Sequence, residues 1–312
     1  MNMYLKNILQ FCFYFLLLFS QYAFASITDE EFKEIVKKIE NIYTPNFKKQ
    51  GYSFNTKVVE NKDFLATETK GRGNKAFVII HKGIKDHPLM DADAVALVYC
   101  HEVGHLMGGS PFEMELEENQ TRKFQGEQAK EYPRSFEGQA DYFASLKCMR
   151  RYLANENNIK VVKQMKVDKT VSELCNKSFS DEGKAAICIR TAMASMTLLS
   201  TFAVLHENES PQFSKTDNLI SSKTRKGHPP LQCRLDTFMA GALCPVDVEI
   251  EVSYENIHQG SCSLLGGHNT RAIRPRCWFY SETEEKIFSG HAGAGVSAGS
   301  SSLISKEAPD CR

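Results

Sequence analysis

Residues 99–106 read YCHEVGHL and lie within a longer apolar segment, residues 91–107. Apolar residues occupy nearly every side of this segment, which predicts a buried helix that ends at the two following glycines. On a helix, side chains four residues apart lie one above the other, so His101 and His105 are placed to bind one metal ion. Glu102 stands beside them, where it can accept a proton from a water that the ion activates.

The alternative for these residues is a histidine pair in the core, satisfied by a buried ion pair. Burying three ionisable side chains without partners is costly. A metal ion bound by His101 and His105, with Glu102 beside it, gives all three side chains one explanation. We therefore favour a metal site.

A tetrahedral catalytic zinc has three protein ligands and one open position. A third histidine six residues after His105 is excluded, because Pro111 stands there. Residues 136–144, FEGQADYFA, offer Glu137 as the third ligand and Asp141 four residues later. Asp141 would then orient a ligand histidine, and the small residue between the two carboxylates allows another helix to approach closely. A solvated acidic helix face is the alternative, which the apolar neighbours disfavour.

These blocks resemble a known signature. HExxH followed by ExxAD is similar to the motif of the gluzincin metallopeptidases. A β-rich run at residues 76–81 precedes the first block. Residues 227–235, GHPPLQCRL, resemble the His-Pro…Arg element of the CAAX prenyl endopeptidase-like family, which includes the heat-shock membrane protease and periplasmic protease-chaperones. The resemblance covers residues 74–243, and only three short blocks of it are specific.

The resemblance implies a zinc endopeptidase with one catalytic Zn²⁺ and a protein or peptide substrate. Its implied metal ligands are His101, His105 and Glu137. Glu102 would be the general base, and Asp141 would orient a ligand histidine. The run at residues 76–81 would be an edge strand that binds an extended substrate by adding a strand.

His228 and Arg234 keep the spacing of the family's element, which implies positions near the metal and catalytic roles. Either side chain could stabilise the oxyanion. His228 could instead occupy the open zinc position as a latch, or only cap the helix that follows. Arg234 could instead only form an ion pair with Asp141 or Asp236.

The amino-terminal residues predict export. One lysine, Lys6, is followed by an apolar run at residues 8–19 and by Ala23 and Ala25, which fit an A-x-A cleavage site. We expect a signal peptide at residues 1–25 and a periplasmic or secreted mature protein without a stable transmembrane segment. Removing this segment leaves 37 basic and 38 acidic residues, a net charge of −1, and nine of the ten cysteines.

The remaining chain predicts an α+β fold: a mainly helical, zincin-like catalytic domain at residues 26–244 with a small sheet whose edge strand flanks the active site. Residues 192–205 are the longest other apolar run and predict a buried core helix. Thr28 followed by Glu31 predicts a capping box at the start of a helix, and residues 135–155 predict a helix. We expect an exposed loop or helix at residues 113–131, a mobile loop at residues 207–227 and a flexible segment at residues 289–302. Residues 245–312 form a cysteine-containing extension, which we expect to be β-rich because apolar and charged residues alternate from Val246 to Val252, with a flexible Gly/Ser-rich tail.

The nine cysteines allow up to four disulfides in an exported protein. Cys100 points away from the metal on its helix, so we expect a buried thiol there or a bond to another helix. Cys233 and Cys244 lie too far apart along one helix to bond to each other. Cys262 and Cys277 could close a hairpin.

The composition of the chain argues against two classes of protein. Equal numbers of acidic and basic residues, 38 each, argue against a nucleic-acid partner, and 42% hydrophobic residues argue against a disordered chain. Two alternatives to a peptidase remain: a non-catalytic chaperone or partner-binding module stapled by zinc, and a metal hydrolase of a non-peptide cell-envelope substrate. The sequence leaves the oligomeric state open.

Overall fold

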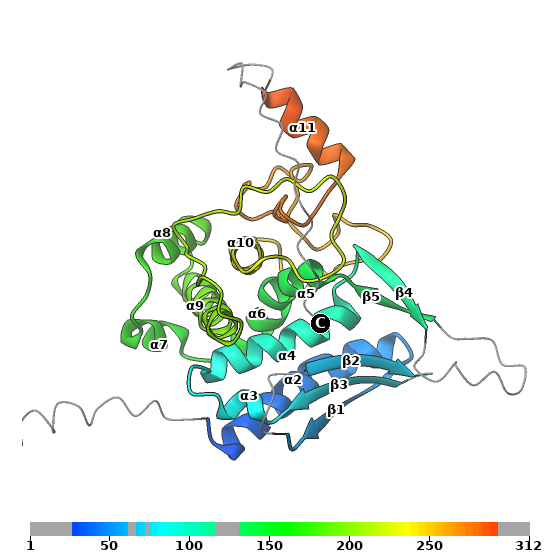
Figure 1. The fold of residues 1–312 in the computed structure, drawn as a ribbon, viewed down its shortest axis with the longest axis vertical. Coiled ribbons are helices and arrows are strands. Elements are labelled where there is room, and N and C mark those ends of the chain that lie inside the picture. Colours follow the sequence, from blue (N-terminus) through cyan, green and yellow to red (C-terminus); the bar gives the residue numbers. More distant parts are fainter. Residues whose placement is uncertain (1–26, 62–66, 73–74, 117–130, 293–312) are drawn as a thin grey trace, which may run out of the picture.

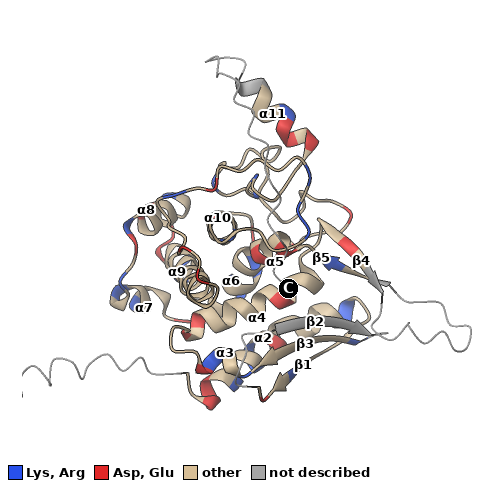
Figure 2. Cartoon of the chain, viewed as in Figure 1, with Lys and Arg blue, Asp and Glu red and all other residues tan. Residues whose placement is uncertain are grey.

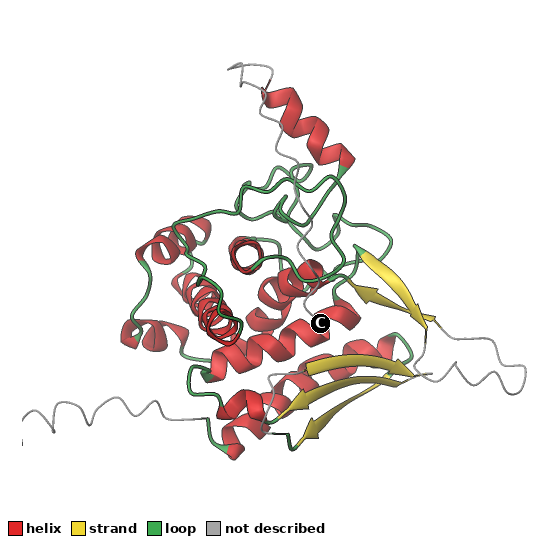
Figure 3. Ribbon diagram, viewed as in Figure 1, coloured by secondary structure: helices red, strands yellow, loops and turns green. Residues whose placement is uncertain are grey.

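The structure, a computed structural model, describes residues 27–61, 67–72, 75–116 and 131–292. The chain is a mixed α+β protein in which about half of the described residues are helical (Figure 3). One buried helix crosses the middle, with a small sheet on one side and further helices on the other (Figure 1). The predicted signal peptide and the tail after residue 292 lie outside the described residues.

Three strands form the larger sheet: β1 (Ser53–Val59), β2 (Thr67–Arg72) and β3 (Lys75–His81). Their order is β1-β3-β2, with β1 parallel and β2 antiparallel to β3. The strand predicted at residues 76–81 is therefore present, but its predicted edge position is wrong. Ala76, Val78 and Ile80 point to the buried face, and such an apolar strand takes the centre of the sheet. Of the two edge strands, β2 is the one that packs beside the central helix.

Two long helices flank this sheet. Helix α2 (Asp29–Lys49) begins with a capping box in which Thr28 and Glu31 bond each other's backbone N–H groups, as its sequence predicts. The central helix, α4 (Ala92–Met107), follows the short α3 (Gly83–Asp86). All residues of α4 from Ala94 onward are buried, because α2, the sheet and five later elements pack around it.

An antiparallel hairpin follows, formed by β4 (Phe112–Leu116) and β5 (Glu131–Ser135). Residues 113–131 were expected to be an exposed loop or helix. That expectation is wrong at both ends of the segment, where these strands pair, and residues 117–130 lie outside the described residues.

The helix predicted at residues 135–155 is present in three successive pieces: α5 (Glu137–Phe143), a π-helical turn η1 (Ala144–Cys148) and α6 (Met149–Leu153). Four further helices follow: α7 (Asn158–Gln164), α8 (Lys169–Ser178), α9 (Glu182–Leu205) and α10 (Leu231–Leu243). By length and composition α9 could cross a membrane, but 61% of its most apolar stretch is buried inside the protein. It packs against α4, α8 and α10, which fits the predicted core helix.

The described part of the carboxy-terminal extension is not β-rich. Residues 245–292 are all described and contain no strand, only irregular chain and α11 (Glu282–Ala292). The alternating segment at residues 246–252 is held differently, because its carbonyls accept hydrogen bonds from basic side chains. Lys147 donates to Asp247 at 2.6 Å, and two arginines of α6 donate to neighbouring carbonyls. A tail that is flexible from residue 289 is also wrong at its start, since α11 continues to Ala292.

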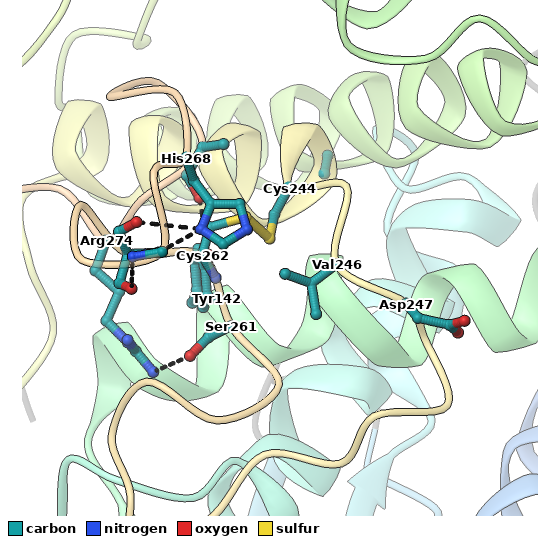
Figure 4. The surroundings of a disulfide bond; sticks show 12 residues. Tyr142, Cys244, Val246, Asp247, Ser261, Cys262, His268 and Arg274 are labelled. Carbon is teal, nitrogen blue, oxygen red and sulfur yellow. Dashed lines mark hydrogen bonds between the residues drawn. A yellow bond between two sulfur atoms is a disulfide. The ribbon is translucent and has the colours of Figure 1, made fainter.

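Four disulfides cross-link the described chain: Cys100–Cys148, Cys175–Cys188, Cys233–Cys277 and Cys244–Cys262. Cys100 thus bonds to another helical segment, and Cys233 and Cys244 pair elsewhere, as expected. The proposed Cys262–Cys277 hairpin bond is wrong, because each of these cysteines joins the extension to α10 instead. Figure 4 shows Cys244–Cys262 with Tyr142 of α5 and Arg274 of the extension beside it. Four disulfides are typical of an oxidising compartment.

Candidate metal centre

The site depends on an unusually close approach of α4 to α5. A Cβ atom added to Gly104 would lie 2.8 Å from the carbonyl oxygen of Ala140, so no larger residue fits at position 104. The small side chain expected to permit a close approach at Ala140 therefore meets a glycine on the other helix. This contact brings the histidines of α4 to the first residue of α5, Glu137.

Three side chains converge at this crossing: His101, His105 and Glu137, all of them buried. Glu137 Oε2 lies 3.2 Å from His101 Nε2 and 3.4 Å from His105 Nε2. In a tetrahedral zinc site, with bonds of about 2.0–2.1 Å, neighbouring ligand atoms are about 3.3 Å apart. Oε2 is buried and has no hydrogen-bond partner among the described residues. A buried carboxylate oxygen surrounded by imidazole nitrogens is an arrangement that fits a cation, so these residues could hold a metal ion.

An acceptor contacts the Nδ1 atom of each histidine and orients its ring. His101 Nδ1 lies 2.7 Å from Asp141 Oδ1, and His105 Nδ1 lies 2.8 Å from the carbonyl oxygen of Ser135. An acceptor at Nδ1 fixes the proton there and leaves Nε2 with a lone pair for a metal. Asp141 is therefore placed as the sequence predicts, whereas a carbonyl acceptor such as that of Ser135 leaves no signal in a sequence.

Arg234 contacts Asp141 and is not one of the three converging side chains. Its Nε and Nη2 atoms donate to the two carboxylate oxygens of Asp141, each at 2.8 Å. Both side chains are buried. Among the roles left open by the sequence, this geometry corresponds to the ion pair with Asp141. Arg234 thus acts on His101 through the carboxylate between them.

Neighbouring charges change the pKa values of His101 and Glu137. Burial opposes a positive charge on His101, but the carboxylates of Asp141 and Glu137 outweigh it and raise the pKa of His101 to about 10. Burial would raise the pKa of Glu137, but His105, His101 and His228 hold it well below the usual value. A metal ion must displace the proton from His101, so metal binding at this site releases protons and weakens on acidification.

Glu102 follows His101 on α4, and its side chain is buried at the same crossing. It lies close enough to Arg234 for the two charges to interact. Glu102 is thus beside the metal cluster without being one of its three converging side chains.

His228 also reaches the cluster. Its Nε2 lies 3.0 Å from Glu137 Oε2, and its ring faces that of His101 at a centroid distance of 6.3 Å. About half of the side chain is exposed. The capping role is wrong, since α10 begins after Pro230 without any side-chain cap. The group of side chains that could together hold an ion is His101, His105 and Glu137, without His228. The latch and the oxyanion role of His228 stay predictions.

The extension supports the segment that carries His228. Residues 207–227, predicted to be a mobile loop, are irregular but bonded: Arg225 N–H donates to the carbonyl of Trp278, and the carbonyl of Lys226 accepts from Glu137 N–H. Trp278 itself packs on the first turn of α5, where a Cβ atom on Gly138 would lie 2.3 Å from its ring. The extension thus contacts the metal cluster through two neighbouring segments.

The prediction from sequence missed one charged residue of the site. Arg134 on β5 places Nη2 3.3 Å from His105 Nε2 and 3.5 Å from Glu137 Oε1. It stands three residues before Glu137 and is the single basic residue of β5, a strand that carries blue in Figure 2. A strand that precedes the ligand helix was not expected here, so nothing in the predicted elements directed attention to it.

A second group, Asp217 with Cys233 and Cys277, also has the spacing of a metal site. The two cysteines are joined in a disulfide, so their sulfur atoms are not thiolate ligands. The cluster at the α4–α5 crossing is therefore the candidate centre. Comparison with known protein families, with curated proteins and with solved structures finds no match to this chain.

Proposed function

We propose that this protein is a zinc-dependent endopeptidase of the gluzincin type, with a zincin-like catalytic region. The observation that carries the proposal is the convergence of His101, His105 and Glu137 at tetrahedral spacing, with Glu102 beside them. The orientation of both histidines by acceptors at Nδ1 supports it further.

The chemistry is that of metal-assisted peptide hydrolysis. His101, His105 and Glu137 would hold a zinc ion, and the chemistry that such an ion would supply is that of a Lewis acid, which polarises a carbonyl and lowers the pKa of water. Glu102 accepts the proton of the attacking water and delivers it to the leaving nitrogen. Asp141 and Arg234 hold the ring of His101 throughout.

His228 is the candidate donor to the oxyanion. Arg234 is engaged with Asp141 through two hydrogen bonds, which leaves the exposed His228 at the mouth of the site in a better position to meet substrate. An imidazole N–H aimed at the developing charge stabilises the transition state more than the ground state. Loss of His228 should therefore lower kcat more than it raises KM.

The substrate would lie along β2. This strand pairs with β3 on one side only, and it packs beside α4. An extended peptide can add to the outer edge of such a strand through main-chain hydrogen bonds, which would bring its carbonyls past the metal cluster. Since main-chain bonding is indifferent to side chains, the class of substrate is an extended protein segment, and export places that substrate in the cell envelope or outside the cell.

Glu102→Gln tests the proposal. The oxidised protein and the variant should bind one zinc each, measured by elemental analysis, while hydrolysis of an unfolded protein substrate falls by at least about 10³-fold in the variant. Glu173→Gln, on the exposed surface of α8, is the matched control and should cleave like the wild type. Unchanged turnover in Glu102→Gln would refute the assignment.

Two alternatives are separated by the same variants. If the protein is a non-catalytic module stapled by zinc, it binds the metal and Glu102→Gln keeps its full biological activity. If it hydrolyses a non-peptide envelope component, the wild type leaves peptides intact, and a panel of cell-wall fragments yields products that the variant does not form.

A further inference from the structure

Arg134 contacts the candidate centre from the hairpin, and no catalytic or ligand role considered so far uses it. Its side chain is one quarter exposed, whereas that of Glu137 beside it is nine-tenths buried. Its Nη2 atom lies 3.3 Å from His105 Nε2 and 3.5 Å from Glu137 Oε1. Arg134 thus places a guanidinium next to the cluster.

The two carboxylate oxygens of Glu137 face different partners. Oε2 faces the Nε2 atoms of His101, His105 and His228, at 3.2, 3.4 and 3.0 Å. Oε1 faces Arg134. A carboxylate that binds a metal through one oxygen leaves the other in need of a donor, and such donors fix the ligand's geometry.

Other nearby cations are engaged elsewhere. Arg234 donates to both oxygens of Asp141, and Lys226 Nζ lies 2.6 Å from Glu113 Oε2. Once a metal occupies the lone pair of His105 Nε2, Arg134 loses that acceptor, because a coordinated nitrogen accepts no hydrogen bond. Glu137 Oε1, 3.5 Å from Nη2, stays an acceptor for Arg134.

We propose that Arg134 is a positioning residue that holds Oε1 of Glu137, so that Glu137 binds the metal through Oε2 alone. A one-oxygen ligand would keep the centre at three protein donor atoms, whereas binding through both oxygens would add a fourth, so the open position that substrate needs is preserved. The inference rests on the proposed metal site, but it does not require that the substrate be a peptide.

Charge and orientation predict opposite effects on metal affinity, which makes the proposal testable. Removing a nearby positive charge alone should tighten binding of a divalent cation. Removing the donor that orients a ligand should weaken it, by about 10–100-fold. Arg134→Gln is therefore expected to weaken zinc binding in chelator competition, although it removes a positive charge. Lys226→Gln, which removes a neighbouring charge paired with Glu113, should bind zinc as tightly as the wild type or more tightly.

Cobalt substitution reports the coordination directly. The wild type loaded with Co²⁺ should show the intense visible absorption of a four-coordinate site. If Glu137 binds through both oxygens in Arg134→Gln, the absorption should fall by about half or more, as expected for a higher coordination number. Arg134→Lys retains a donor and should restore part of both the spectrum and the affinity.

Three outcomes would overturn the inference. In the first, Arg134→Gln binds zinc as tightly as the wild type and its cobalt spectrum is unchanged. In the second, Lys226→Gln matches Arg134→Gln in both measurements, and in the third the wild type takes up neither metal. If Arg134→Gln fails to fold, Arg134→Lys carries the same comparison with an intermediate expected effect. A wild type that shows the predicted spectra but cleaves no peptide would refute the proposed function and leave this inference standing.

Discussion

Asp141→Asn is the perturbation that best separates the fold from the metal site. Asparagine keeps the shape of the side chain but removes its charge. In the structure the carboxylate contacts His101 at 2.7 Å and receives two hydrogen bonds from Arg234 at 2.8 Å, and it is fully buried. The substitution therefore leaves a buried guanidinium without its counter-charge and a ligand histidine without its anionic acceptor.

Two magnitudes follow from this geometry. Removing one partner of a buried ion pair costs about 3–5 kcal/mol of stability, because the other charge stays buried and uncompensated. Removing the carboxylate behind a ligand histidine costs about 10–100-fold in metal affinity, which corresponds to about 1.4–2.8 kcal/mol. Arg234→Met should cost a similar amount of stability but less metal affinity, since Asp141 stays in contact with His101.

The assay combines urea unfolding of the metal-free protein with chelator competition for zinc, on both single variants and the double variant. We expect the double variant to be less destabilised than the sum of the two single variants, because it buries no unpaired charge. Zinc affinity of Asp141→Asn within about threefold of the wild type would refute the orienting role. A loss of stability below about 1 kcal/mol would refute the buried-pair argument.

Two further predictions concern the frame around the site. Replacing Cys100 and Cys148 together by alanine removes a disulfide between residues separated by 48 in sequence. The free energy of unfolding, measured with urea, should fall by about 4 kcal/mol. A fall of less than about 1 kcal/mol would contradict a stabilising role of this disulfide. Burial lowers the pKa of Lys147 to about 8, helped by the neighbouring arginines, whereas in the unfolded chain it stays near 10.5. Between these pH values the unfolded chain binds more protons than the folded protein. The free energy of unfolding of the wild type, relative to that of Lys147→Met, should therefore rise from about pH 8 to about pH 10 by up to about 3 kcal/mol. A difference that does not change with pH would show that the ammonium is hydrated in the folded protein.

Much of the site followed from local sequence pattern. The apolar segment around residues 99–106 forms the buried helix α4, and the spacing of its two histidines places them on one side of it. Glu137 and Asp141 lie on the second helix that the pattern predicted, in contact with those histidines. Helical periodicity is a property of neighbouring residues, so a sequence displays it directly.

Predictions that depended on contacts between segments far apart in the sequence were less accurate. Alternation from Val246 to Val252 satisfied the rule for a strand, but a strand needs a partner, and the carbonyls of this segment bond to side chains of η1 and α6 instead. The strand at residues 76–81 formed, but its place in the sheet depended on where β1 and β2 joined it. Neither partner is specified by the segment's own pattern.

The sequence by itself determined the central helix, the spacing of its two histidines, the helix that carries Glu137 and the presence of enough cysteines for four cross-links. Only the tertiary structure decided which cysteines pair, that β2 is the edge strand beside α4, that Arg234 serves Asp141, and that Arg134 faces Glu137. The physical reason is the distance along the chain over which each feature is decided. Helical spacing is fixed within a few residues, whereas a disulfide, a sheet edge or the partner of a cation depends on distances between segments far apart in the chain.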